Sequence, residues 1–165
     1  MKVMKMTDKK FKRVLILMSI IFLVAIPLLF LLSDTRDQSV KEVENEFNIN
    51  LPKSVKRVRE LYKEPDFHGD GEAAILFSVD KGDIDEIKKE LKDYRVLEEA
   101  DKISAIETCY NAIIKRGFDP SINLDKEKYF KETSDYKFEG IYGNFIALII
   151  DEEKGEILFI QWDTW

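Results

Sequence analysis

The fold of this chain is decided by the stretch NFIALIIDEEKGEILFIQWD, residues 144–163. Its two apolar runs, 144–151 and 156–163, have the length and character of strands. The residues between them, Glu152 to Gly155, form a short loop with glycine where a left-handed backbone is needed. The stretch therefore predicts an antiparallel hairpin at the end of the chain.

Two further strands are expected nearer the N-terminus. A compact apolar run at 73–79 has the character of a buried strand. The stretch 55–62 is ambiguous, because its apolar residues have helical spacing while its β-branched content favours an extended chain. We expect a strand there, since it precedes another strand.

Apolar residues at helical spacing predict three helices. Ser39 begins a capping-box pattern for a short helix that ends near Asn48. A second helix is expected at 84–94. A third follows at 101–117, and its last residue is a glycine, as is typical just beyond the end of a helix.

These elements predict an α+β domain in the order ββααββ, an antiparallel sheet covered by helices on one face. A loop is expected from 119 to 136, between the last helix and the closing hairpin. The single cysteine, Cys109, has no partner for an internal disulfide and lies on an apolar helix face, so we expect it in the core.

A second decisive stretch is VLILMSIIFLVAIPLLFLL, residues 14–32, which contains no charge. As a helix it is about 28 Å long and nearly matches a hydrocarbon core of about 30 Å. Six basic residues and one acidic residue precede it, a net charge of +5. The positive-inside rule places the N-terminus in the cytoplasm and the remainder of the chain outside.

A cleaved signal peptide is the competing interpretation of this stretch. Signal peptides have an apolar region of about 7–15 residues and small residues at the cleavage site. This run is longer, and Leu31 stands two positions before Ser33, the best small residue. We therefore expect an uncleaved signal anchor. The expected organisation is a basic cytoplasmic tail at 1–13, a transmembrane helix at 14–32, a linker at 33–38 and an extracytoplasmic domain at 39–165.

Charge separates the two sides of the membrane. The chain has 26 basic and 32 acidic residues, and removing the six and one of the tail leaves 20 and 31, a net charge of −11 outside. Such an acidic domain disfavours nucleic acid and anionic lipid head groups as partners. An outer domain without disulfides fits the exterior of a bacterium.

The stretch DFHGDGE at 66–72 holds the only histidine. Four of its side chains alternate and would share one side of an extended chain: Asp66, His68, Asp70 and Glu72. They form a candidate ligand-binding loop, because oxygen and imidazole groups can hold a divalent ion. The pattern resembles a calcium loop at its start but has Phe77 where the bidentate glutamate belongs. Zinc would need more His or Cys.

The alternative for this loop is a polar turn in which Gly69 and Gly71 take positive φ. No second histidine and no placed nucleophile accompany His68, so we assign no catalytic residue, metal or cofactor.

Several short motifs resemble those of one group of proteins. They are LPKS at 51–54, HGDGE at 68–72, NF at 144–145 leading to Asp151, and ILF at 157–159 followed by WDT at 162–164. The group consists of small membrane-anchored or lipid-anchored proteins of Gram-positive bacteria of the Bacillus and Clostridium type. The resemblance implies strands around the HGDG turn and a location in the cell envelope, and it implies no reaction.

A second similarity involves Glu44, Phe47, Leu51 and Pro52, which are similar to the opening of SMI1/KNR4-type immunity domains. It implies immunity against a toxin as a variant of the function. We expect a single-pass bacterial membrane protein whose non-enzymatic outer domain binds an unknown envelope protein or ligand. The alternative is a metal-dependent envelope enzyme that uses the HGDGE loop.

Overall fold

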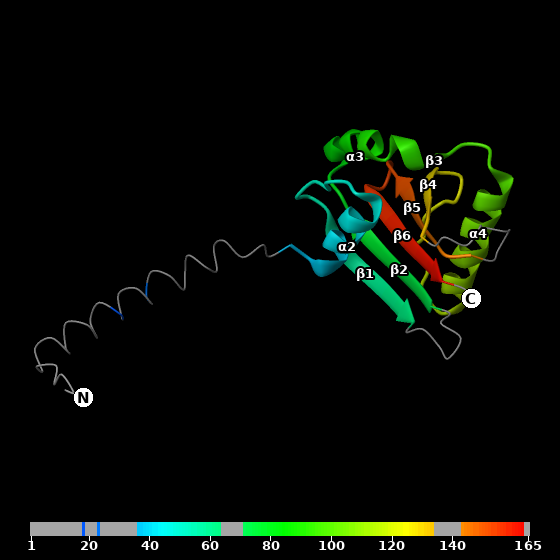
Figure 1. Ribbon diagram of the computed structural model, residues 1–165, viewed down its shortest axis with the longest axis horizontal. Coiled ribbons are helices and arrows are strands. Elements are labelled where there is room, and N and C mark those ends of the chain that lie inside the picture. The colour runs from blue at the N-terminus through cyan, green and yellow to red at the C-terminus, as the bar shows by residue number, and fades with distance from the viewer. Residues whose placement is uncertain (1–17, 19–22, 24–35, 64–70, 134–142, 164–165) are drawn as a thin grey trace, which may run out of the picture. The chain divides into compact units, whose positions relative to one another are not determined.

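The computed structural model describes residues 18, 23, 36–63, 71–133 and 143–163 (Figure 1). The chain divides into two compact units, Met1–Arg36 and Asp37–Trp165. Among the described residues, no helix combines the length and the apolar character that a bilayer crossing needs. Only Met18 and Leu23 of the expected span are described, so the tail and the span otherwise lie outside the described residues.

Within the described part of the second unit, six antiparallel strands form one sheet in the order β1-β2-β6-β5-β4-β3. The strands are β1 (Lys56–Lys63), β2 (Gly71–Ser78), β3 (Arg95–Val96), β4 (Glu127–Glu132), β5 (Phe145–Asp151) and β6 (Glu156–Asp163). The closing strand β6 lies between β2 and β5, so it connects the pair β1 and β2 to the group β5, β4 and β3. The predicted α+β class and antiparallel sheet are confirmed.

Three α-helices accompany the sheet in the described residues: α2 (Gln38–Phe47), α3 (Ile84–Glu90) and α4 (Ala100–Lys115). Short 3-10 turns, η1 (Lys81–Asp83) and η2 (Lys92–Tyr94), flank α3, and η2 replaces the last turn of the helix expected at 84–94. The glycine expected after the third helix is confirmed, because Gly117 has φ +85°.

The first helix is capped by a different residue from the one expected. Asp37 is the N-cap of α2, and its carboxylate accepts a hydrogen bond from the backbone N–H of Ser39 at 2.9 Å. Ser39 lies inside the first turn and is buried. The helix ends where predicted, at Asn48, which takes the left-handed conformation with φ 53°.

The sheet is covered on both faces, and the expectation of helices on one face is wrong (Figure 1). The helices α2 and α3 pack with one core cluster, which includes Ile75 and Phe159 of the sheet. The helix α4 packs with the other cluster, which includes Leu76 and Leu158. The physical reason is that both faces are apolar: all seven residues of β5 are buried.

The expected loop at 119–136 contains a strand. The segment Glu127–Glu132 forms β4 and pairs with β5 along its whole length. Its sequence, EKYFKE, has only two apolar residues, and each serves a different face: Tyr129 belongs to one core cluster and Phe130 to the other. A strand with one buried residue on each face leaves no periodic apolar signal.

The closing hairpin is confirmed, with Phe145 paired with Trp162 at one end and Asp151 with Glu156 at the other. Gly155 has φ +70°, and its N–H donates to the carbonyl of Asp151 at 2.9 Å. A Cβ at this position would lie 2.7 Å from the backbone oxygen of Val79. Both observations require glycine in this loop.

Candidate functional site

The structure describes only the end of the HGDGE loop. Asp66, His68, Gly69 and Asp70 lie outside the described residues, and whether they gather around a ligand stays a prediction. Gly71 begins β2 and is paired with Asp163 in the ladder, so the expected positive-φ turn does not include it.

Glu72 is described, and its carboxylate faces a cation. Its Oε2 lies 3.0 Å from Nη1 of Arg116, at the C-terminal end of α4, and the Glu72 side chain is only 10% exposed. The two groups form a close ion pair, although Oε2 has no partner that is aligned as a hydrogen bond. Arg116 therefore compensates the buried charge of Glu72, and a metal at Glu72 would have to displace it.

Cys109 lies in the same region and is fully buried, as expected. Burial raises the pKa of its thiol well above the usual value, and the charge of Glu72 adds to this effect. Because the thiolate is the reactive form, this cysteine belongs to the core and not to a nucleophilic site. Among the described residues, no three His, Cys, Asp or Glu side chains gather so as to hold a metal ion.

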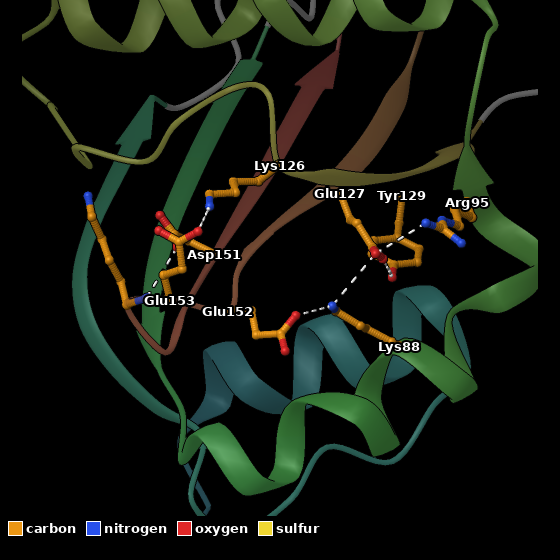
Figure 2. A network of polar contacts seen from close by, with 9 residues as sticks. Lys88, Arg95, Lys126, Glu127, Tyr129, Asp151, Glu152 and Glu153 are labelled. Carbon is orange, nitrogen blue, oxygen red and sulfur yellow. Dashed lines mark hydrogen bonds and ion pairs between the residues drawn. The ribbon is translucent and has the colours of Figure 1, made fainter.

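The structure reveals an ion-pair network that the sequence did not predict (Figure 2). Glu127, at the start of β4, lies 3.1 Å from Arg95 of β3 and 3.6 Å from Nζ of Lys88. The hydroxyl of Tyr129 donates a hydrogen bond to Glu127 at 2.8 Å. Lys88 also pairs with Glu152 at 2.5 Å. The network thus connects α3 to β4 and to the loop of the closing hairpin.

The network continues along that loop. Lys126 pairs with Glu153 at 2.7 Å, and Nζ of Lys81 donates to the carbonyl of Glu153 at 2.5 Å. Asp151 is buried, and its carboxylate accepts a hydrogen bond from the backbone N–H of Lys154 at 3.2 Å. Lys81, Lys126 and Glu153 border a surface hollow of about 610 Å³, together with Lys88, Glu127 and Glu152.

The charges of Lys88 and Lys126 in this hollow are already compensated. The hydrogen bond to Glu152 raises the pKa of Lys88, and the bond to Glu153 raises that of Lys126. Burial and the hydrogen bond to Glu127 raise the pKa of Tyr129. Both lysines therefore keep their protons at neutral pH, and neither supplies the neutral amine that nucleophilic catalysis needs. The arrangement serves to hold α3 and the hairpin loop against the sheet.

A third region, the edge strand β1, is exposed over most of its length. It lies at one end of the described sheet and has eight residues, whereas β3 at the other end has two. Its sequence, KRVRELYK, carries four basic residues and one acidic residue. Val58 and Tyr62 of this strand are 58% and 69% exposed.

A β-bulge at Val58 gives the two faces of β1 different chemistry. Arg57 and Arg59 would share a face in a regular strand, but the register shifts between them. Arg59 instead lies opposite Leu76 on the α4 side, donates to the carbonyl of Gly117 at 2.7 Å and lies 4.9 Å from the ring centre of Phe118.

Arg57 lies on the other side of β1, opposite Phe77 and beside α2. It pairs with Glu60 and, at 3.2 Å, with Asp37, the residue that caps α2. The bulge therefore lets one arginine fix each neighbouring helix to the edge strand. The basic content of 56–63 was the sequence signal that could have drawn attention to this edge.

Comparisons with protein family models, with curated proteins and with solved structures found no match to this chain. The function must therefore be argued from the geometry of these three regions.

Proposed function

We propose that this chain is a single-pass protein of a bacterial cell membrane, anchored by residues 14–32, whose outer domain binds an envelope protein. The observation that supports this proposal best is the long, exposed edge strand β1. An unpaired strand edge presents backbone donors and acceptors that another chain can pair with. Immunity against a secreted toxin is one form that such binding could take.

Binding at the edge is favoured because the two sheet faces are already occupied. Both faces of the described sheet are covered by core clusters and their helices. At the other end of the described sheet, β3 has two residues and pairs only with Lys128 and Tyr129 of β4, so the open edge there is short and interrupted. The described domain thus concentrates its open backbone groups and two of its exposed apolar side chains, Val58 and Tyr62, on β1.

The rival function, a metal-dependent enzyme built on the HGDGE loop, draws less support from the described residues. Its one described member, Glu72, is paired with Arg116. Metal analysis of the purified protein after dialysis separates the two proposals. A stoichiometric content of Zn, Ca or Mn would favour the enzyme.

The proposal is tested by photo-crosslinking in native membranes. A photoreactive phenylalanine analogue replaces Tyr62 of β1 in one variant and Lys89, an exposed residue of α3, in a matched control. We expect a crosslinked adduct with a protein at position 62 and none at position 89. No adduct at position 62, or equal adducts at both positions, would contradict a binding surface on β1.

The proposed orientation is tested separately with intact protoplasts. Added protease should digest residues 33–165 and leave the basic tail protected. Protection of the C-terminal domain would show that the proposed orientation is wrong.

A further inference from the structure

We propose that the edge strand β1 binds its partner as an added strand, and that this segment of the partner alternates acidic with apolar residues. This inference rests on the proposed binding function and names the class of segment that the edge accepts. It commits to a protein segment in extended conformation, paired with β1 through backbone hydrogen bonds.

The preference for acidic residues follows from the charge of β1. Its eight residues carry a net charge of +3, from four basic residues and one acidic residue. A second copy of β1 would place two such strands side by side, and like charges on paired strands are destabilising. An acidic segment removes this repulsion, so the edge selects against self-association and in favour of an oppositely charged strand.

The overall acidity of the outer domain does not cancel this preference. The net charge of −11 is spread over residues 33–165, and exposed charges are screened beyond about 8 Å at physiological ionic strength. A strand added to β1 would lie about 5 Å from it. At that distance the basic residues of β1 dominate the interaction.

The alternation follows from the two faces beside β1. On the α4 side, Lys56 lies opposite Ser78, Arg59 opposite Leu76 and Leu61 opposite Ala74, so two of these three side chains are basic. On the α2 side, Glu60 lies opposite Ile75 and Tyr62 opposite Ala73. Arg57 also lies on this side, opposite Phe77, but its charge is already paired with Asp37 and Glu60. Every second side chain of an added strand would meet the basic side, and the others would meet the side with an acid and an aromatic ring.

The α2 side disfavours a second set of acids. Glu42 and Glu46 of α2 border a hollow of about 600 Å³ together with Lys41 and Tyr62, so acids outnumber bases in its lining. Burial raises the pKa of Glu42, and the charges of Glu46 and Glu60 raise it further. Another carboxylate here would add to this repulsion, whereas an apolar side chain could cover the exposed ring of Tyr62. The partner therefore presents acids to one side and apolar residues to the other.

The test uses the full-length protein in detergent micelles and synthetic fluorescent peptides of the length of β1. The first peptide alternates Glu and Val. The second has the same composition with all Glu in one half, and the third is the first peptide with every backbone nitrogen methylated. Binding is measured by fluorescence anisotropy. Lys56→Glu changes the charge on β1, and Lys89→Glu is the matched control on α3, since both side chains are exposed.

We expect the alternating peptide to bind at least tenfold more tightly than the other two, because only it can pair its backbone and present its acids to one side. Lys56→Glu should weaken that binding about threefold or more, and Lys89→Glu should leave it unchanged. Equal binding of the methylated peptide would overturn strand addition, and equal binding of the second peptide would overturn the alternation.

The peptide test and the crosslinking test fail separately. If no peptide binds while the adduct at position 62 persists, the binding function stands and the mode of binding proposed here is wrong. If that adduct is absent as well, the proposed function itself is wrong.

Discussion

Replacing Gly155 by alanine should destabilise the closing hairpin more than the same change at Gly117 or Gly82 destabilises the fold. The backbone at Gly155 has φ +70°, and a Cβ there would lie 2.7 Å from the carbonyl oxygen of Val79. The backbone of Val79, just after β2, is itself held in place, because its N–H donates to the carbonyl of Gly155 at 2.9 Å.

The magnitude has two parts. A left-handed backbone costs a residue with a Cβ about 1–2 kcal/mol relative to glycine. Relieving a contact that is shorter than van der Waals distance adds about 1–3 kcal/mol, since the obstacle is backbone and cannot rotate away. We therefore expect a loss of about 2–5 kcal/mol in the free energy of unfolding.

Two other glycines provide matched controls. Gly117 has φ +85° but open space around its Cα, so Gly117→Ala should cost only the backbone part, about 1–2 kcal/mol. Gly82 has open space and no positive φ, and Gly82→Ala should be neutral or stabilise the fold by up to about 1 kcal/mol.

The assay is equilibrium unfolding in urea, followed by the fluorescence of Trp162, which packs against the core. The order of stability should be Gly82→Ala, then Gly117→Ala, then Gly155→Ala. If Gly155→Ala were as stable as Gly117→Ala to within about 0.5 kcal/mol, the close approach to Val79 would be refuted.

Three further changes test other parts of the structure. Folding raises the pKa of Tyr129, so above about pH 10 the unfolded state binds fewer protons than the folded state and the free energy of unfolding falls as pH rises. Urea unfolding at increasing pH should show this fall, and Tyr129→Phe should reduce it. An equal fall in the variant would contradict the assignment to Tyr129. Asp37→Ala should cost about 0.5–2 kcal/mol because α2 loses the acceptor for the N–H of Ser39, while Asp37→Asn should retain most of the stability in the same assay. Iodoacetamide should leave Cys109 unmodified in the folded protein and alkylate it in urea, as judged by mass spectrometry, and rapid alkylation without urea would show that the thiol is accessible.

Local and periodic signals predicted much of the fold. The closing hairpin, with Gly155 in its loop, follows from two apolar runs and a glycine, because a hairpin depends on residues that are close in sequence. The ends of α2 and α4 follow from Asn48 and Gly117, whose left-handed conformations are a local property.

Features that depend on distant contacts were missed. The strand β4 has a polar sequence and exists because it pairs with β5. The prediction placed helices on only one face of the sheet. The continuous apolar run of β5, in which every residue is buried, indicates instead that both faces are covered. Asp37 was missed as the cap because Ser39, two residues further along the chain, begins a capping-box pattern of its own.

The functional regions also combine features that are visible in the sequence with features that only the fold creates. The charge of β1 is visible in the sequence, but its position at the edge of the sheet follows only from strand order. The ion pairs around Glu127 join residues that are 32 to 64 positions apart, Lys88 and Glu152 being the most distant pair, and no local pattern could reveal them. Asp66, His68 and Asp70 of the candidate loop lie outside the described residues, and a ligand site there stays a prediction.

The central claim is that an envelope protein pairs with the edge strand β1 on the outer side of the membrane. Its most direct test is competition in intact protoplasts that carry the photoreactive analogue at Tyr62. Added from outside, the alternating Glu and Val peptide should abolish the crosslinked adduct, and its fully N-methylated form should not. Persistence of the adduct at saturating peptide, or equal loss with both peptides, would contradict the claim.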